Sequence, residues 1–205
     1  MRIVRPVVAV ATLACLAGGV TANAATKPKP VCNLLTDDAG DAKALGFAPS
    51  DDVLDIVSAD FGSSKKALGI VVRVKRASTK SSTYPTGLKW QTTFTIDDKT
   101  YFASVVSDGT VDGAFGTTGT GSNSILTTPP ATIDTAKNEL RISIPFSDFP
   151  VPVSKTAIIS GVQVIAGTTK AFKTPVVSGS LGGLTADDAT TDKTFKLGTV
   201  SCVKV

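Results

Sequence analysis

Apolar residues alternate with polar or small ones along much of this chain, and that period of two residues is what most restricts its fold. Every second position is apolar from Leu68 to Val74, and Trp90, Phe94 and Ile96 alternate in the same way with polar neighbours. Successive side chains of a strand point to opposite faces of a sheet, so the pattern predicts strands that bury one face. No stretch after the first 24 residues keeps a helical period for three turns, and the segment 145–150 has room for one helical turn at most.

The predicted strands are short, numerous and separated by turn residues. They fall at 53–61, 68–74, 90–96, 100–106, 111–115, 131–135, 140–144, 157–165, 171–177 and 199–203. Asp97, Asp98 and Lys99 form a short polar turn that suits a hairpin. About ten strands without intervening helices predict an all-β fold, a two-sheet antiparallel β-sandwich of jelly-roll or immunoglobulin-like type, with a closed barrel as the alternative. The segments 107–132 and 178–196 lack the pattern and are predicted to be long loops or a loose hairpin.

The first 24 residues have the three parts of a secretory signal peptide. Arg2 and Arg5 precede an apolar stretch, and small residues follow at 22–24. The apolar stretch is shorter than the roughly 20 residues that cross a bilayer as a helix, so we predict a secreted, extracellular protein with no membrane span. The predicted organisation is a signal peptide at 1–24, a flexible lead-in at 25–31 and a single domain at 32–205.

Cysteine usage agrees with export. Cys15 lies inside the predicted leader, which leaves Cys32 and Cys202. An even pair in an oxidising compartment favours a disulfide, and this one would join the two ends of the domain. The alternatives are two free buried thiols and, for Cys15, lipidation.

Missing residue types exclude much enzyme chemistry. The chain has no histidine, which removes the Ser-His-Asp and Cys-His arrangements and the usual general base. Glu139 is the one glutamate, and we expect it in an exposed hairpin turn with no reason for a raised pKa. Loss of Arg2 and Arg5 with the leader would leave 19 basic against 17 acidic residues, so no nucleic-acid partner is expected. We therefore predict a protein that is not an enzyme, with an aspartate-dependent secreted hydrolase as the alternative.

Two groups of aspartates have the composition of a calcium site. Asp37, Asp38 and Asp41 surround Gly40, and Asp51, Asp52 and Asp55 follow. Calcium takes six to eight oxygen ligands from carboxylates and carbonyls, and together the two groups could supply one such site. The alternative is that these residues simply form turns. A third group, Asp187, Asp188 and Asp192, is a weaker candidate.

The same residues carry a resemblance to a known family. The stretch 35–41, the stretch 52–60, the strand 68–74 and a hairpin from Trp90 to Val106 are together similar to extracellular β-sandwich domains of the DOMON and family-nine carbohydrate-binding-module group, as in exported actinobacterial proteins. The resemblance implies a jelly-roll-like sandwich, a binding role and, in some members, structural calcium. By matching motif it implies Asp37, Asp41 and Asp55 as the calcium ligands. One departure is Asp38, where the family pattern often has proline.

The resemblance leaves the ligand open. Haem-binding members use methionine and histidine as axial ligands, which the chain after residue 24 lacks, so we expect no haem, and no nucleotide either. Sugar sites usually offer exposed aromatic rings, but Trp90 faces the predicted core, which leaves Tyr84 as the candidate ligand-binding ring. The predicted function is a secreted, non-catalytic binding or surface-interaction module for a cell-wall or extracellular glycan. A structural or inhibitor protein of the cell envelope is a further alternative.

Overall fold

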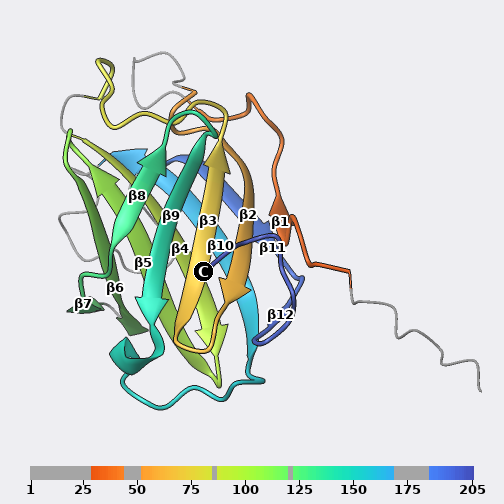
Figure 1. The fold of residues 1–205 in the computed structure, drawn as a ribbon. Coiled ribbons are helices and arrows are strands. Elements are labelled where there is room, and N and C mark those ends of the chain that lie inside the picture. Colours follow the sequence, from red (N-terminus) through yellow and green to blue (C-terminus); the bar gives the residue numbers. More distant parts are fainter. Residues whose placement is uncertain (1–28, 44–51, 85–86, 120–121, 169–184) are drawn as a thin grey trace, which may run out of the picture.

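The chain folds as a β-sandwich of two antiparallel sheets (Figure 1). The structure is a computed structural model, and it describes residues 29–43, 52–84, 87–119, 122–168 and 185–205. The predicted signal peptide, most of the lead-in and the predicted strand 171–177 lie outside these residues. Within the described residues, helical structure is limited to a 3₁₀ turn, η1 (Phe146–Asp148), so no helix there is long enough to span a membrane.

The first sheet has five strands in the order β1-β2-β3-β9-β8. These are β1 (Leu35–Thr36), β2 (Ile56–Ser63), β3 (Ala67–Val74), β9 (Glu139–Pro145) and β8 (Ala131–Asp134). The second sheet runs β11-β10-β4-β5-β6-β7, with β12 also paired to β10. Its strands are β11 (Thr185–Thr191), β10 (Ile158–Thr168), β4 (Leu88–Ile96), β5 (Lys99–Ser107), β6 (Val111–Gly119), β7 (Ser122–Thr127) and β12 (Phe195–Lys196). The predicted sandwich is confirmed, and the sheets do not close into a barrel.

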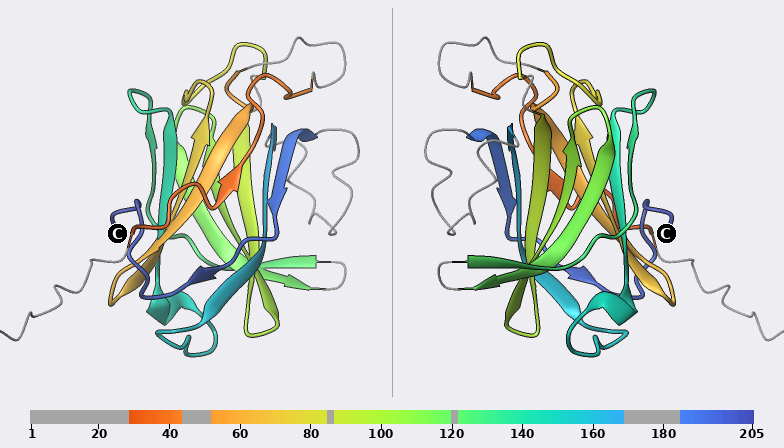
Figure 2. Two further views of the ribbon diagram at one scale, coloured as in Figure 1. Left: turned by 90° about the vertical axis from the view of Figure 1, so that its right-hand side faces the viewer. Right: turned by 90° about the vertical axis from the view of Figure 1, so that its left-hand side faces the viewer.

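Figure 2 shows the two sheets as separate layers, and the core between them is built from the alternating apolar positions. Trp90 and Phe94 of β4 are almost fully buried, as are Leu68 and Ile70 of β3. The Phe61 and Phe94 rings, one from each sheet, meet edge to face with centroids 5.5 Å apart, a favoured aromatic geometry. Side chains that alternate with these point outward, so each sheet has a second face.

The hairpin predicted around residues 97–99 is present. Asp97 and Asp98 both have positive φ, at 48° and 61°, as a two-residue turn between twisted strands requires. The strands are longer than predicted, because β5 already begins at Lys99.

Both segments predicted to be long loops or a loose hairpin contain strands: the hairpin alternative describes the first, where β6 pairs with β7, and the loop alternative is wrong for both. The first holds β7 and the second half of β6, where Gly116 and Gly119 interrupt any apolar alternation. The second holds β11 and β12, and β11 buries the alanines Ala186 and Ala189, residues with weak strand preference. Conversely, the predicted strand 199–203 is reduced to a single bridge between Ser201 and Val31.

The two ends of the domain lie together on the outer face of the five-stranded sheet. Cys32 and Cys202 form the predicted disulfide, with their Cα atoms 5.3 Å apart. The Val31 N–H donates to Val200 O at 2.9 Å, which ties the two segments together as well. The C-terminal segment packs closely on β2, where a Cβ at Gly62 would lie 2.6 Å from Val203 O. Glycine at this position therefore lets the segment lie flat on the sheet.

Candidate metal centre

Three carboxylates from distant parts of the chain converge at the edge where the two sheets approach each other. Asp37 and Asp41 follow β1, and Asp187 lies on β11. One carboxylate oxygen from each lies within 4.8 Å of the other two. We call these three residues the acidic cluster.

Backbone contacts hold the two segments side by side. The Lys43 N–H donates to Ala186 O at 2.6 Å, next to the acidic cluster, and the Thr191 hydroxyl donates to Leu34 O at 3.3 Å. The Asp37 N–H donates to Val57 O at 2.9 Å, which ties the same segment to β2. The segment 34–43 therefore lies along β11, and these main-chain contacts bring its carboxylates to Asp187.

Asp187 is the most perturbed member of the cluster. Its Oδ2 accepts a hydrogen bond from the Ile56 N–H at 2.6 Å, and its Oδ1 accepts one from the Asp188 N–H at 2.9 Å. Burial, followed by the negative charges of Asp37 and Asp41, raises the pKa of Asp187 to about 6, although the two N–H groups oppose this. Near neutral pH, this carboxylate is thus held in an environment that disfavours its charge.

Asp37 is in a similar environment. Burial, and next the charge of Asp41, raises the pKa of its carboxyl group. Its Oδ2 is buried and has no hydrogen-bond partner among the described residues, which is costly for a charged oxygen. This oxygen lies beside two other carboxylates. A bound cation would supply the missing partner and offset the repulsion between the negative charges.

Asp55, the third predicted ligand, is placed beside the acidic cluster rather than in it. Its side chain is 1% exposed, and its Oδ2 accepts the Gly40 N–H at 2.6 Å and lies 3.8 Å from Lys75 Nζ. Gly40 has φ +97°, a conformation that glycine adopts without strain, so Asp55 anchors the turn between Asp37 and Asp41. The other oxygen, Oδ1, is buried, and no hydrogen bond reaches it from the part of the chain that the structure describes.

The structure thus brings together Asp37 and Asp41 as expected, adds Asp187 and gives Asp55 a supporting contact. Asp52, from the second aspartate group, instead pairs with Lys75 Nζ at 3.0 Å, and Asp51 lies outside the described residues. The sequence signal for Asp187 was the third aspartate group. Its proximity to Asp37 depends on a strand that the apolar pattern does not reveal.

The geometry of the acidic cluster suits a hard divalent cation. Oxygens bound to one calcium ion at about 2.4 Å lie at most about 4.8 Å from one another, which is the spread observed here. Carboxylates are the ligands calcium prefers, and the unsatisfied Asp37 oxygen is one available donor. Asp37, Asp41 and Asp187 are therefore the residues that would hold the ion.

Tyr84 does not offer the exposed ring expected of it. The residue is 5% exposed and belongs to the hydrophobic core. The turn at Ser81, whose Oγ accepts the Tyr84 N–H at 3.2 Å, precedes this inward position. The expectation of an exposed sugar-binding ring is therefore wrong for this residue.

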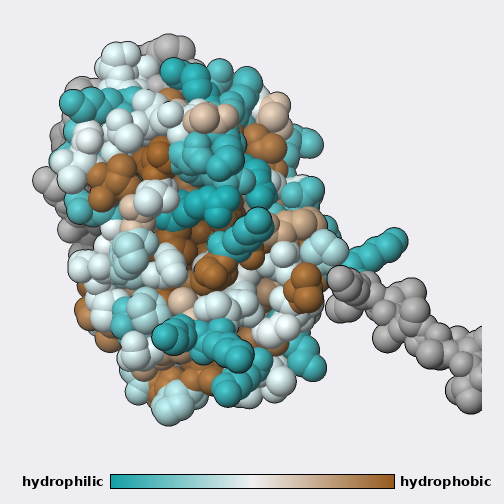
Figure 3. All heavy atoms as spheres, in the orientation of Figure 1, coloured by the Kyte–Doolittle hydropathy of each residue, from teal (hydrophilic) through white to brown (hydrophobic). Residues whose placement is uncertain are grey.

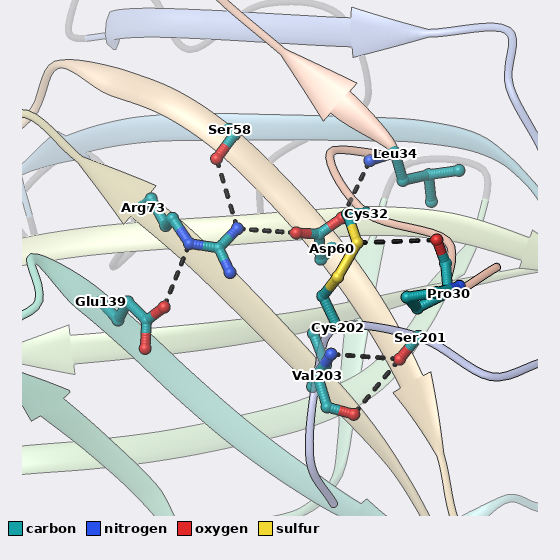
Figure 4. Close-up of a disulfide and its surroundings, with 10 residues drawn as sticks. All are labelled: Pro30, Cys32, Leu34, Ser58, Asp60, Arg73, Glu139, Ser201, Cys202 and Val203. Atoms are coloured by element: carbon teal, nitrogen blue, oxygen red, sulfur yellow. Dashed lines mark hydrogen bonds and ion pairs between the residues drawn. A yellow bond between two sulfur atoms is a disulfide. The ribbon is translucent and has the colours of Figure 1, made fainter.

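A second group of charged residues, which the sequence did not indicate, lies on the outer face of the five-stranded sheet (Figure 4). Arg73 of β3 contacts Asp60 of β2 at 2.6 Å and Glu139 of β9 at 3.0 Å, and Arg141 also contacts Glu139. We call these four residues the arginine cluster. Figure 3 shows this face, where hydrophilic side chains gather across the middle.

Glu139 is therefore not in the exposed turn expected from the sequence. It is the first residue of β9 and is 7% exposed. Burial alone would raise its pKa, but Arg141 and Arg73 outweigh burial and lower the pKa of its carboxyl group. The nearby Asp60 carboxylate accepts the Leu34 N–H at 2.9 Å, so the arginine cluster also holds the N-terminal segment on the sheet.

Comparisons of the chain with protein-family models, with curated proteins and with solved structures found no match. The resemblance to DOMON and family-nine carbohydrate-binding domains therefore stays a prediction.

Proposed function

We propose that this chain is an exported, non-catalytic binding module whose sandwich is locked by one structural calcium ion. The observation that carries the calcium proposal is the convergence of Asp37, Asp41 and Asp187 within 4.8 Å. The ion would bridge the segment after β1 to β11 and neutralise carboxylates that otherwise repel one another. Its role would be to fix one edge of the sandwich, while the ligand binds elsewhere.

A binding role is supported by what the ionisable groups can do. The chain has no histidine, and Glu139 is held by two arginines that keep it ionised, which makes it a poor proton donor. The proposed ligand is a cell-wall or extracellular glycan. Purified protein incubated with isolated cell walls and with a glycan array tests this part, and retention on neither would contradict it.

One observation favours the second candidate, an aspartate-dependent hydrolase. Asp187 has a pKa of about 6 and lies beside Asp37, so the pair could share a proton as catalytic carboxylate pairs do. A screen against glycoside, ester and peptide substrates distinguishes the candidates. Turnover that Asp187→Asn abolishes would favour the hydrolase.

Thermal melts test the calcium proposal directly. A ligand that binds only the folded state stabilises it by about 2.7 kcal/mol when its free concentration is one hundred times the dissociation constant. We expect millimolar calcium to raise the melting temperature above that in excess chelator, and Asp187→Asn to abolish the difference.

Asp188→Asn is the matched control. The Asp188 carboxylate accepts hydrogen bonds from Gln163 Nε2 at 3.0 and 3.1 Å, away from the acidic cluster, so this variant should keep the calcium response. Superimposable melts of the unchanged protein in calcium and in chelator would rule out the site.

A further inference from the structure

Within the described residues the two sheets have four edges, and these differ in how their free backbone groups are protected. An edge strand presents unpaired N–H and C=O groups that can pair with another strand. The edges are β1 and β8 in the five-stranded sheet and, in the seven-stranded sheet, β7 on one side and β11 with the short β12 on the other.

Three of these edges carry protection. β1 is two residues long, and β8 is four residues long, follows Pro129 and Pro130 and ends at the charged Asp134. β11 carries Asp187 and Asp188, and the Lys43 N–H already caps its Ala186 carbonyl. Short strands, prolines, charges and covering segments are the devices that block edge pairing.

In the described part of the chain, β7 has none of these devices. It is six residues long, and its sequence Ser-Asn-Ser-Ile-Leu-Thr has no charge and no proline. Among the described strands it pairs with β6 alone. Ser124, Ile125 and Leu126 are exposed, and Ile125 has the highest exposure, 65%, among the large exposed apolar residues. Figure 2 shows the β6–β7 hairpin extending away from the other described strands of the sandwich.

The base of the hairpin is nevertheless fixed. The Thr127 hydroxyl donates to Asp148 Oδ2 of η1 at 2.9 Å, so the last residue of β7 is held against the body of the domain. An ordered, uncharged edge of this kind can accept a strand with little loss of conformational freedom.

We propose that β7 is a self-association edge, at which two copies of this chain pair antiparallel about a two-fold axis. With the axis at Ile125, Ile125 of one copy lies opposite Ile125 of the other, and Ser124 lies opposite Leu126. The pairing would join two seven-stranded sheets into one and cover the exposed apolar side chains. A second copy is the fitting occupant because an antiparallel strand is complementary to itself and this one brings no like charges together.

Sedimentation of the purified protein across a concentration series tests the proposal. We expect a monomer–dimer equilibrium, and we expect Ile125→Lys to weaken the dimer at least about tenfold by placing two lysines opposite each other. Val151→Lys is the matched control, since Val151 is a 44% exposed apolar residue outside every strand, and it should leave the equilibrium unchanged. A monomer at all concentrations, or a dimer insensitive to Ile125→Lys, would overturn the proposal.

An engineered cysteine gives a second readout that does not depend on weakening the dimer. Residues directly opposite in an antiparallel pair have Cα atoms about 4.5 to 5.5 Å apart, within the range a disulfide spans. Ile125→Cys should therefore cross-link two copies rapidly under mild oxidation, whereas Val151→Cys should not. Equal cross-linking of the two variants would also overturn the proposal.

Discussion

Asp60 and Glu139 lie against two arginines, whereas Asp37, Asp41 and Asp187 lie against one another. In the arginine cluster the positive charges lower the pKa of Glu139, and in the acidic cluster burial and mutual repulsion raise the pKa values of Asp37 and Asp187. Both groups bury carboxylates on the same sandwich. The difference teaches that the first cluster carries its counter-charge within the chain, whereas the second is the one for which we propose a counter-charge from solution.

The largest expected effect comes from removing the internal counter-charge. Arg73→Met would leave the Asp60 carboxylate, whose side chain is 1% exposed, without its cation and Glu139 with one arginine in place of two. A buried charge without its partner typically destabilises by about 3 to 5 kcal/mol, and we expect a loss of this size in urea unfolding.

Lys137→Met supplies the comparison for that measurement. The Lys137 side chain is 66% exposed and pairs with Asp134 at 3.0 Å, and exposed pairs contribute about 1 kcal/mol or less. Equal losses in the two variants would show that the arginine cluster is not the internally balanced group described above.

A pH series distinguishes the acidic cluster from the arginine cluster, because the two should change the free energy of unfolding in opposite directions as the pH rises. The pKa of Asp187 is raised from 3.8 to about 6, so in chelator the folded state binds its proton more tightly and the free energy of unfolding should fall between pH 4 and 6. The fall is up to roughly 3 kcal/mol. Glu139 acts oppositely because its pKa is lowered from 4.5, so its stabilisation is lost as pH drops below that value.

Urea unfolding at each pH, with chelator or with calcium, gives the measurement. Calcium binds the ionised carboxylates, so it should remove the decline in the free energy of unfolding between pH 4 and 6. Asp187→Asn should flatten the same part of the curve of unfolding free energy against pH measured in chelator. A chelator curve that rises steadily from pH 4 to 6 would contradict the assignment for Asp187.

The smallest expected effect is that of Asp41→Asn on stability, which should have opposite signs in chelator and in calcium. In chelator, Asp41→Asn removes one repelling charge and should stabilise the protein by about 0.5 kcal/mol, the scale of exposed charge interactions. In calcium the same change removes a ligand and should lower the melting temperature. Asp192 is an exposed aspartate outside the acidic cluster. Asp192→Asn should therefore leave the stability unchanged both in chelator and in calcium. The same sign for Asp41→Asn in both conditions would argue against a metal centre.

The strands with clear apolar alternation could be predicted from the sequence, and those without it could not. Leu68 to Val74 and Trp90 to Ile96 show one apolar face each, and both are core strands. β11 and β7 form because β10 and β6 provide ladder partners, and their own residues are mostly alanine, serine, threonine and aspartate. Such strands are specified by their neighbours rather than by local pattern.

The candidate site divides in the same way. Asp37 and Asp41 are near each other in sequence, so their grouping was visible, whereas Asp187 joins them through the register of β11 and the path of residues 34–43. The arginine cluster combines three different strands, and its pairing depends on β3 lying between β2 and β9. Neither strand order nor register can be read from local sequence.

The bond between Cys32 and Cys202 also decides how the protein would respond to pulling. It joins residues separated by 170 positions, and every strand from β1 to β12 lies in the loop that it closes. A tensile force applied to the segments outside the two cysteines would pass from one sulfur to the other without loading a single strand ladder. Under shear at a surface, the strands between the two cysteines would therefore carry no tension. The sandwich would stay folded for as long as the disulfide stays oxidised.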